Sequence, residues 1–89
     1  MKNILQKATV VDVRTPEEFK DGHYPGAINI PVNEVPKRID EFKSMQLPIV
    51  AYCRSGSRSG MAISILKQNG INDVHNGGGL TDLLQQKNK

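Results

Sequence analysis

The chain reads PIVAYCRSGSRSG at residues 48–60. Its first five residues form the most apolar short run in the sequence, and such a run, ended by polar residues, predicts a buried strand. The segment from Arg58 to Asn69 then carries apolar residues at helical spacing, with Gly70 as its C-terminal stop, which predicts a helix. The only cysteine, Cys53, therefore lies where a buried strand passes into a helix.

The same alternation continues outward on both sides. Further strands are predicted at residues 9–13, 27–30 and 72–75, and further helices from Thr15 to Gly22, from Asn33 to about Met45 and from Leu80 to Gln86. Thr15 and Glu18 form a capping box at the start of the first of these helices. Residues 77–79 are all glycine and predict a turn. Strands that alternate with helices predict an α/β fold of three layers, with a small central parallel sheet flanked by helices on both faces.

Length and composition exclude several classes of protein. With 89 residues, the chain is expected to form a single domain over residues 1–89 and to be a monomer. The net charge of +3 comes without a block of basic residues, and there is no tryptophan, so no nucleic-acid partner is expected. No run approaches the roughly 20 apolar residues of a membrane span, and the N-terminus has no signal-peptide pattern, so we expect no membrane contact and a cytoplasmic location.

A single cysteine can form neither an intramolecular disulfide nor a cysteine-rich zinc site. His23, Cys53 and His75 lack the spacing of metal ligands, so neither a metal nor a cofactor is expected. His23 is interpreted as a hydrogen-bonding residue near a turn rather than as a base. Asp12 and Arg14 stand at the end of the predicted first strand, where a structural ion pair is favoured over a catalytic role.

The loop after Cys53 has the composition of an anion site. Ligands of open parallel sheets bind at the carboxyl ends of the strands, which is where Cys53 stands. Gly56 allows a tight backbone, so that successive N–H groups at the helix start can converge on one point. Arg54 and Arg58 add two positive charges. A cysteine in this setting is expected to have a pKa well below its ordinary value and to act as a thiolate nucleophile. The alternative of an inert buried cysteine is disfavoured, because such residues have apolar neighbours.

The sequence resembles a single-domain rhodanese from about residue 10 to residue 83. Three segments carry the resemblance: residues 11–31 (VDVRTPEEFKDGHYPGAINIP), residues 50–59 (VAYCRSGSRS) and residues 77–79 (GGG). Two features depart from the family pattern. Leu83 stands where members commonly have tryptophan, and the short segment before residue 9 indicates that an N-terminal strand or helix is missing.

The resemblance implies a sulfurtransferase without a cofactor. Cys53 would attack the outer sulfur of a small anionic donor such as thiosulfate, or of a persulfide or polysulfide, and would pass that sulfur to a thiophilic acceptor. The acceptor would be cyanide, a thiol or a carrier protein. The residues implied to cradle the transferred sulfur are Arg54, Ser55, Gly56, Ser57 and Arg58.

Three alternatives stay open at this stage. The domain could relay sulfur from one protein to another, or it could be a non-catalytic binding module of the same fold. A cysteine phosphatase or arsenate reductase is a weaker alternative, because these enzymes need a longer loop than the four residues that separate Cys53 from Arg58.

Overall fold

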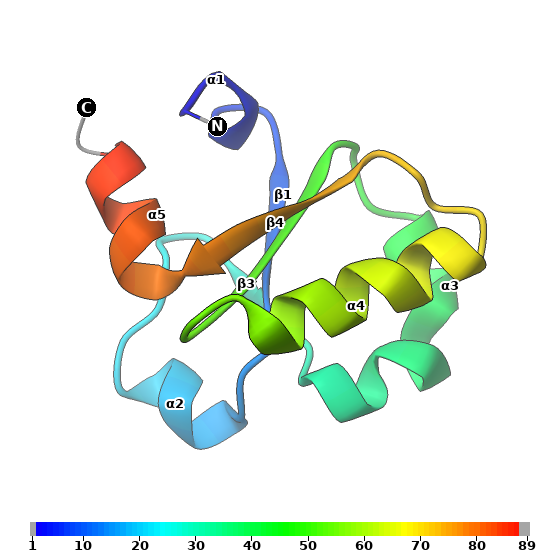
Figure 1. The fold of residues 1–89 in the computed structure, drawn as a ribbon, viewed down its shortest axis with the longest axis horizontal. Helices are drawn as coiled ribbons and strands as arrows, with labels where there is room; N and C mark the ends of the chain where they lie inside the picture. Colours follow the sequence, from blue (N-terminus) through cyan, green and yellow to red (C-terminus); the bar gives the residue numbers. More distant parts are fainter. Residues whose placement is uncertain (1, 88–89) are drawn as a thin grey trace.

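The computed structural model describes residues 2–87 as a layered α/β structure (Figure 1). Its elements are α1 (Lys2–Leu5), β1 (Thr9–Asp12), α2 (Pro16–Lys20), β2 (Ile28–Asn29), the 3₁₀ helix η1 (Val32–Arg38), α3 (Ile39–Lys43), β3 (Ile49–Cys53), α4 (Ser57–Gln68), β4 (Val74–Gly79) and α5 (Leu80–Lys87). The four strands form one parallel sheet in the order β2-β1-β3-β4, which confirms the predicted sheet. Across residues 2–87, none of the helices is long and apolar enough to cross a bilayer.

The central strand β3 supplies side chains to two hydrophobic cores, one on each face of the sheet. Ile49, Ala51 and Cys53 belong to the core that η1, α3 and α4 cover. Val50 and Tyr52 belong to the opposite core, which α1 and α5 cover (Figure 1). Successive side chains of a strand point to opposite faces, so this division follows from the two-residue period. The predicted three layers are confirmed, and Cys53 lies on the α4 side.

The two departures from the family pattern are both accommodated in the core beside α1 and α5. Leu83 is completely buried there. Its methyl groups and those of Val50 lie so close to Gly77 that a side chain at that glycine would crowd them. The short segment before the first strand forms α1, which contributes the buried Leu5 to the same core.

The predicted single helix from Asn33 to Met45 is also wrong. The segment divides into the 3₁₀ helix η1 and the short α3, and the residue before η1 is Pro31, which makes no side-chain cap hydrogen bond. Pro36 lies inside η1. A proline has no backbone N–H and disfavours the α conformation at the preceding residue, which accounts for the tighter 3₁₀ turns in place of a continuous α-helix.

The glycine triplet lies inside a strand rather than in the predicted turn. β4 runs to Gly79, beyond the predicted end at residue 75. Its pairing with β3 is interrupted by a bulge: Ala51 pairs with Asn76, but Cys53 pairs with Gly79, so β4 contains one residue more than β3 across this interval. Gly78 has a φ of +79°, which glycine adopts without steric cost. The glycines therefore permit an irregular strand to pass close to its neighbours.

A buried ionic network joins the carboxyl end of β1 to β3. The Asp12 carboxylate is fully buried and accepts hydrogen bonds from Arg14 Nε at 2.9 Å and Nη2 at 2.7 Å, which confirms the predicted ion pair. The Tyr52 hydroxyl donates to Asp12 Oδ2 at 2.8 Å and accepts from the Tyr24 N–H at 2.9 Å. Burial raises the pKa of Tyr52, so its hydroxyl remains a donor at every ordinary pH.

This network generates a stability prediction. Asp12→Asn keeps the shape of the side chain but leaves the buried Arg14 without its counter-charge, and we expect it to lower the free energy of unfolding by about 3 kcal/mol. Tyr52→Phe removes one hydrogen bond to a charged group and should cost about 1.5 kcal/mol. Urea denaturation of the two variants measures both effects. An Asp12→Asn variant no less stable than Tyr52→Phe would contradict the proposed importance of the ion pair.

Candidate active site

Cys53 is the last residue of β3 and stands at the carboxyl end of a central strand. Every residue of β3 is buried, and Cys53 itself is completely buried. The chain then turns through residues 54–56, and α4 begins at Ser57, one residue earlier than predicted. Gly56 occupies the position before the helix with a φ of +100°, a left-handed conformation that side chains rarely adopt. This conformation turns the loop back over the cysteine sulfur.

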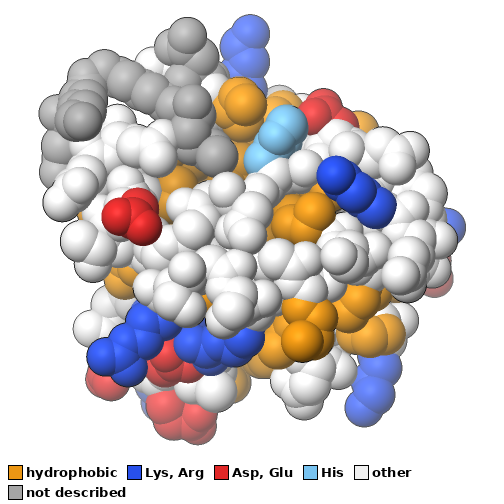
Figure 2. Space-filling model, viewed as in Figure 1, with side chains coloured by type: hydrophobic (Ala, Val, Ile, Leu, Met, Phe, Trp, Pro, Cys, Tyr) orange, Lys and Arg blue, Asp and Glu red, His pale blue; other side chains and the backbone are white. Residues whose placement is uncertain are grey.

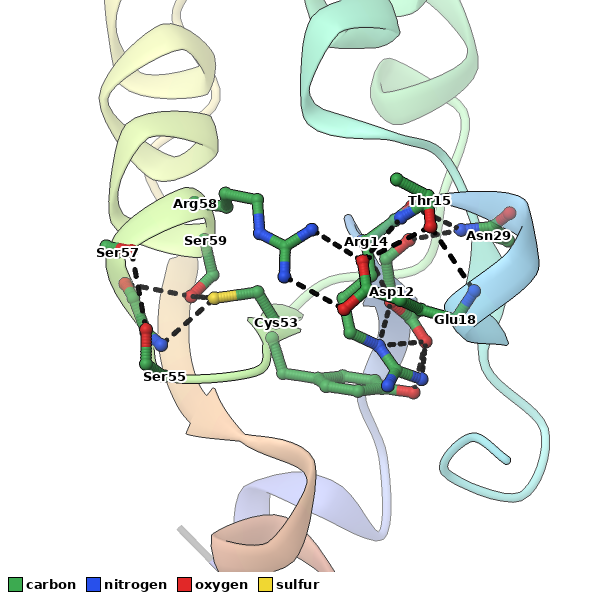
Figure 3. Close-up of polar contacts among 12 residues, drawn as sticks. Asp12, Arg14, Thr15, Glu18, Asn29, Cys53, Ser55, Ser57, Arg58 and Ser59 are labelled. Atoms are coloured by element: carbon green, nitrogen blue, oxygen red, sulfur yellow. Dashed lines mark hydrogen bonds and ion pairs between the residues drawn. The ribbon is translucent and has the colours of Figure 1, made fainter. Parts of the chain in front are cut away.

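Hydrogen-bond donors of the loop converge on that sulfur (Figure 3). The Gly56 N–H donates to Cys53 Sγ at 2.9 Å, and the Ser59 hydroxyl lies 3.6 Å from the same atom. Burial raises the pKa of Cys53. The Ser59 hydroxyl and the backbone N–H groups of Ser59, Ser55 and Gly56 outweigh that effect and lower the pKa from 9.0 to about 7. A substantial fraction of the cysteine is therefore thiolate at neutral pH.

The lowered pKa agrees with the sequence-based expectation, but its physical origin is different. From the sequence, the helix start and the two arginines are expected to lower the pKa of Cys53. In the structure the leading favourable contributions are short-range hydrogen bonds from the loop backbone and from one serine. Backbone N–H groups held in place by the fold stabilise the thiolate without any reorganisation.

A hydrogen-bonded pair of side chains, Ser59 and Asn76, fixes the loop against β4. Ser59 Oγ lies 2.6 Å from Asn76 Oδ1, which also accepts the Gly78 N–H at 2.9 Å. Asn76 Nδ2 donates to the Gly56 carbonyl at 2.9 Å. The amide oxygen of Asn76 thus accepts a backbone N–H, and its amide nitrogen donates to a backbone carbonyl, so the orientation of the amide is determined. Through these bonds Asn76 connects the loop to the bulged strand.

Sequence reasoning placed neither residue in the predicted site. A signal existed for Ser59, because helical side chains lean toward the N-terminus and a serine in the first turn can therefore reach back to the cysteine. No such signal existed for Asn76, whose position depends on the bulge between β3 and β4.

The two predicted arginines have different surroundings. Arg58, in the first turn of α4, donates from Nη1 and Nη2 to the two carboxylate oxygens of Glu18 on α2, at 2.7 and 3.1 Å (Figure 3). Its hydrogen bonds to Glu18 raise the pKa of Arg58, and the same contacts lower the pKa of Glu18 to about 2. Arg54 is exposed and lines a pocket of about 270 Å³. The other residues around this pocket are Arg14, Glu18, Asp21, Leu80 and Thr81.

The remaining residues of the predicted cradle contribute mainly through the backbone. Ser55 and Gly56 direct N–H groups at the sulfur, whereas the hydroxyls of Ser55 and Ser57 lie 3.4 Å apart on the exposed side of the loop. A side chain at Gly79 would overlap the carbonyl group of Arg54. The loop and β4 can therefore lie this close only because residue 79 is glycine.

The histidines have structural contacts of their own. The ring of His23 stacks on Phe19 with 3.7 Å between ring centroids, and its Nδ1 lies 2.8 Å from the Phe19 carbonyl oxygen. His75 Nε2 lies 3.0 Å from the carboxylate of Asp73. Within residues 2–87, the side chains of histidine, cysteine, aspartate and glutamate form no cluster of three that could hold a metal ion.

A buried strand that ends in a cysteine, followed by a short loop whose N–H groups surround the sulfur, is the geometry of a thiolate-based group-transfer site. A family model described as Rhodanese-like domain matches residues 1–85 of this chain. The chain belongs to the rhodanese family. The resemblance of the three sequence segments is thereby confirmed.

Individual relatives agree with this assignment. The rhodanese domain described here is 41% identical over 80 residues to the thiosulfate sulfurtransferase PspE of Escherichia coli (strain K12), covering 89% of this chain and 77% of PspE. It is 39% identical over 71 residues to the uncharacterized protein YqhL of Bacillus subtilis (strain 168), covering 80% of this chain and 56% of YqhL, so it spans little more than half of that relative. A solved structure described as a rhodanese with anions from E. coli superposes with a TM-score of 0.77 at 41% identity, covering 84% of this chain and 89% of that one.

The hydrogen bonds to the sulfur generate a prediction about its titration. We expect the rate of alkylation of Cys53 by iodoacetamide to rise with pH through a midpoint near 7, because the pKa of the thiol is lowered to about 7. Ser59→Ala removes the hydroxyl that stabilises the thiolate, so the midpoint should move to higher pH. Ser57→Ala is the matched control, since its hydroxyl contacts Ser55 instead of the sulfur. A wild-type midpoint at the ordinary value of 9.0, or equal midpoints for the two serine variants, would count against this account.

Proposed function

We propose that this rhodanese is a sulfurtransferase that carries a sulfane sulfur as a persulfide on Cys53. The observation that supports the proposal most directly is the group of backbone donors around Sγ, the N–H groups of Ser55, Gly56 and Ser59, with the Ser59 hydroxyl oxygen 3.6 Å away. They provide a preorganised environment for one negatively charged sulfur atom. The proposal takes residues 1–89 as a single rhodanese-like domain in the cytoplasm, where a reactive thiol stays reduced.

The proposed reaction has two balanced steps. In the first, the Cys53 thiolate attacks the outer sulfur of thiosulfate, a new S–S bond forms, and the old S–S bond breaks with its electron pair leaving on sulfite. The product is a Cys53 persulfide anion, which the loop N–H groups stabilise. In the second, cyanide or a thiolate attacks the outer sulfur, and the Cys53 thiolate leaves with the bonding pair. No external oxidant or reductant is required.

Loop size favours sulfur transfer over phosphatase chemistry. The backbone N–H groups of Ser55, Gly56 and Ser59 already point at Cys53 Sγ itself. A phosphoryl group would need donors for three additional equatorial oxygens, and the four residues between Cys53 and Arg58 make a small cradle. A non-catalytic binding role is disfavoured because a purely structural cysteine has no need of a lowered pKa.

Cys53→Ser tests the proposed sulfur carrier. Incubation of the wild type with thiosulfate should add the mass of one sulfur atom, and added cyanide should remove it and release thiocyanate. Cys53→Ser should show neither the added mass nor the transfer, because a serine hydroxyl forms no persulfide, while its urea midpoint stays close to that of the wild type. Substantial thiocyanate formation by Cys53→Ser would refute the proposal. An added sulfur that cyanide leaves in place but a persulfide-accepting protein removes would favour the relay.

The two loop arginines differ in their availability to an anionic donor. The guanidinium of Arg58 is held in an ion pair with Glu18. Arg54, in contrast, is exposed and lines the pocket together with Leu80. An arginine can bind the sulfite end of thiosulfate through two parallel hydrogen bonds. The first solved relative described above is a rhodanese with anions, which supports anion binding in this family. We therefore assign the sulfite end of the donor to Arg54.

Arg54→Ala should reduce kcat/KM for thiosulfate about tenfold, because thiosulfate carries an oxyanion that Arg54 can bind. The kcat/KM for an uncharged organic polysulfide should stay nearly the same. Arg58→Ala should have a smaller effect on thiosulfate. The loss in Arg54→Ala should shrink as salt rises, because exposed charges are screened. Arg38→Ala is the control, because Arg38 forms an equivalent bidentate pair with Glu41 elsewhere on the surface. If the ratio of kcat/KM for thiosulfate to kcat/KM for the polysulfide is the same in Arg54→Ala and Arg38→Ala, Arg54 does not select the donor.

A further inference from the structure

We infer that Glu18 determines the donor specificity of this site, because its carboxylate occupies the Arg58 contact that an anionic donor would otherwise make. This inference rests on the proposed sulfurtransferase function. Glu18 then weakens the binding of small oxyanions and favours donors that are held by other contacts.

The ion pair has the geometry of an anion complex. Two nitrogens of Arg58 donate to two oxygens of Glu18 at 2.7 and 3.1 Å, the parallel arrangement in which a guanidinium also binds sulfate or the sulfite end of thiosulfate. The two side chains are 32% and 29% exposed, so an anion from solvent can reach them. Because the pKa of Glu18 is about 2, the carboxylate stays charged throughout the neutral range.

The pair lies beside the reacting sulfur. Arg58 precedes Ser59, whose hydroxyl contacts Sγ. Figure 3 shows the guanidinium of Arg58 reaching from α4, on the side where Cys53 lies, across to Glu18 on α2. The hydrogen bonds to Glu18 have the largest effect on the raised pKa of Arg58, and the charge of Cys53 adds a smaller one. An oxyanion bound by Arg58 would thus be close to the nucleophile.

The charge of Glu18 determines whether the surroundings of the site are neutral or cationic. Arg14 is paired with the buried Asp12, and Arg58 is paired with Glu18. Asp21 adds a further negative charge at the pocket that Glu18 also lines, where Arg54 provides the opposing positive charge. An incoming dianion therefore meets an environment with little net positive charge. Removal of the charge of Glu18 alone would release Arg58 and make that environment cationic.

The main test is Glu18→Gln. Glutamine is also accepted at this position of a capping box, so α2 keeps its cap on Thr15. In the unreactive Cys53→Ser background, sulfate and thiosulfate should bind about three- to tenfold more tightly after this change, measured by calorimetric titration at low salt. In the reactive protein, KM for thiosulfate should fall by a similar factor, and kcat/KM for an uncharged organic polysulfide should not change. Glu41→Gln removes the same charge from the matched Arg38 pair and should leave all three quantities unchanged.

A double-mutant cycle tests whether Glu18 acts through Arg58. Arg58→Ala should abolish the gain in sulfate affinity that Glu18→Gln produces, because the gain depends on release of that guanidinium. Glu18→Asp, which keeps the charge but shortens the side chain, should give a smaller gain and serves as the second variant if Glu18→Gln is unstable in urea. The inference is overturned if sulfate affinity is unchanged or weaker in both Glu18 variants, or if the gain persists without Arg58. Sulfate binding requires no sulfur transfer. Failure to load Cys53 with sulfur from any donor would therefore refute the proposed function, whereas unchanged sulfate affinity would refute the role of Glu18.

Discussion

The loop after Cys53 keeps its shape because its backbone lies directly against β4. Cys53 pairs with Gly79, and any side chain at that glycine would overlap the Arg54 carbonyl. The same close approach lets Asn76 hold the Gly56 carbonyl and the Ser59 hydroxyl. Without this contact between loop and strand, the N–H groups would not be held in convergence on one sulfur atom. The bulge and the glycines of β4 are therefore part of the site, although they carry no reactive group.

Backbone groups, more than charged side chains, create the electrostatic environment of the thiolate. The donors nearest to Sγ are N–H groups and a serine hydroxyl, and together they overcome the cost of burial. The arginines have other partners or positions: Arg58 pairs with Glu18, and Arg54 lines the pocket. Such a division suits the proposed carrier of a single sulfur atom, since fixed dipoles stabilise the persulfide while the exposed Arg54 remains available for the larger end of a donor.

Successive side chains of β3 point to opposite faces of the sheet, so this strand has both a structural and a chemical role. Cys53 faces the α4 side, whereas the preceding Tyr52 faces the opposite core and hydrogen-bonds to the buried Asp12. The ion pair of Asp12 with Arg14 therefore stabilises the carboxyl ends of β1 and β3 from the side away from the nucleophile. Rigidity at the end of β3 is a condition for a precisely placed sulfur, because the loop starts from that residue.

The sequence by itself was sufficient for the parallel α/β fold, for the position of Cys53 at the end of a buried strand, for the capping box of Thr15 and for the Asp12–Arg14 pair. These features depend on local periodicity and on residues close together along the chain. Only the tertiary structure decided that Glu18 meets Arg58, that Asn76 meets Ser59 and that the glycine triplet belongs to a bulged strand. The first two contacts join residues 40 and 17 positions apart. They arise from the packing of α2, α4 and β4 at one end of the sheet, and no local pattern encodes that packing.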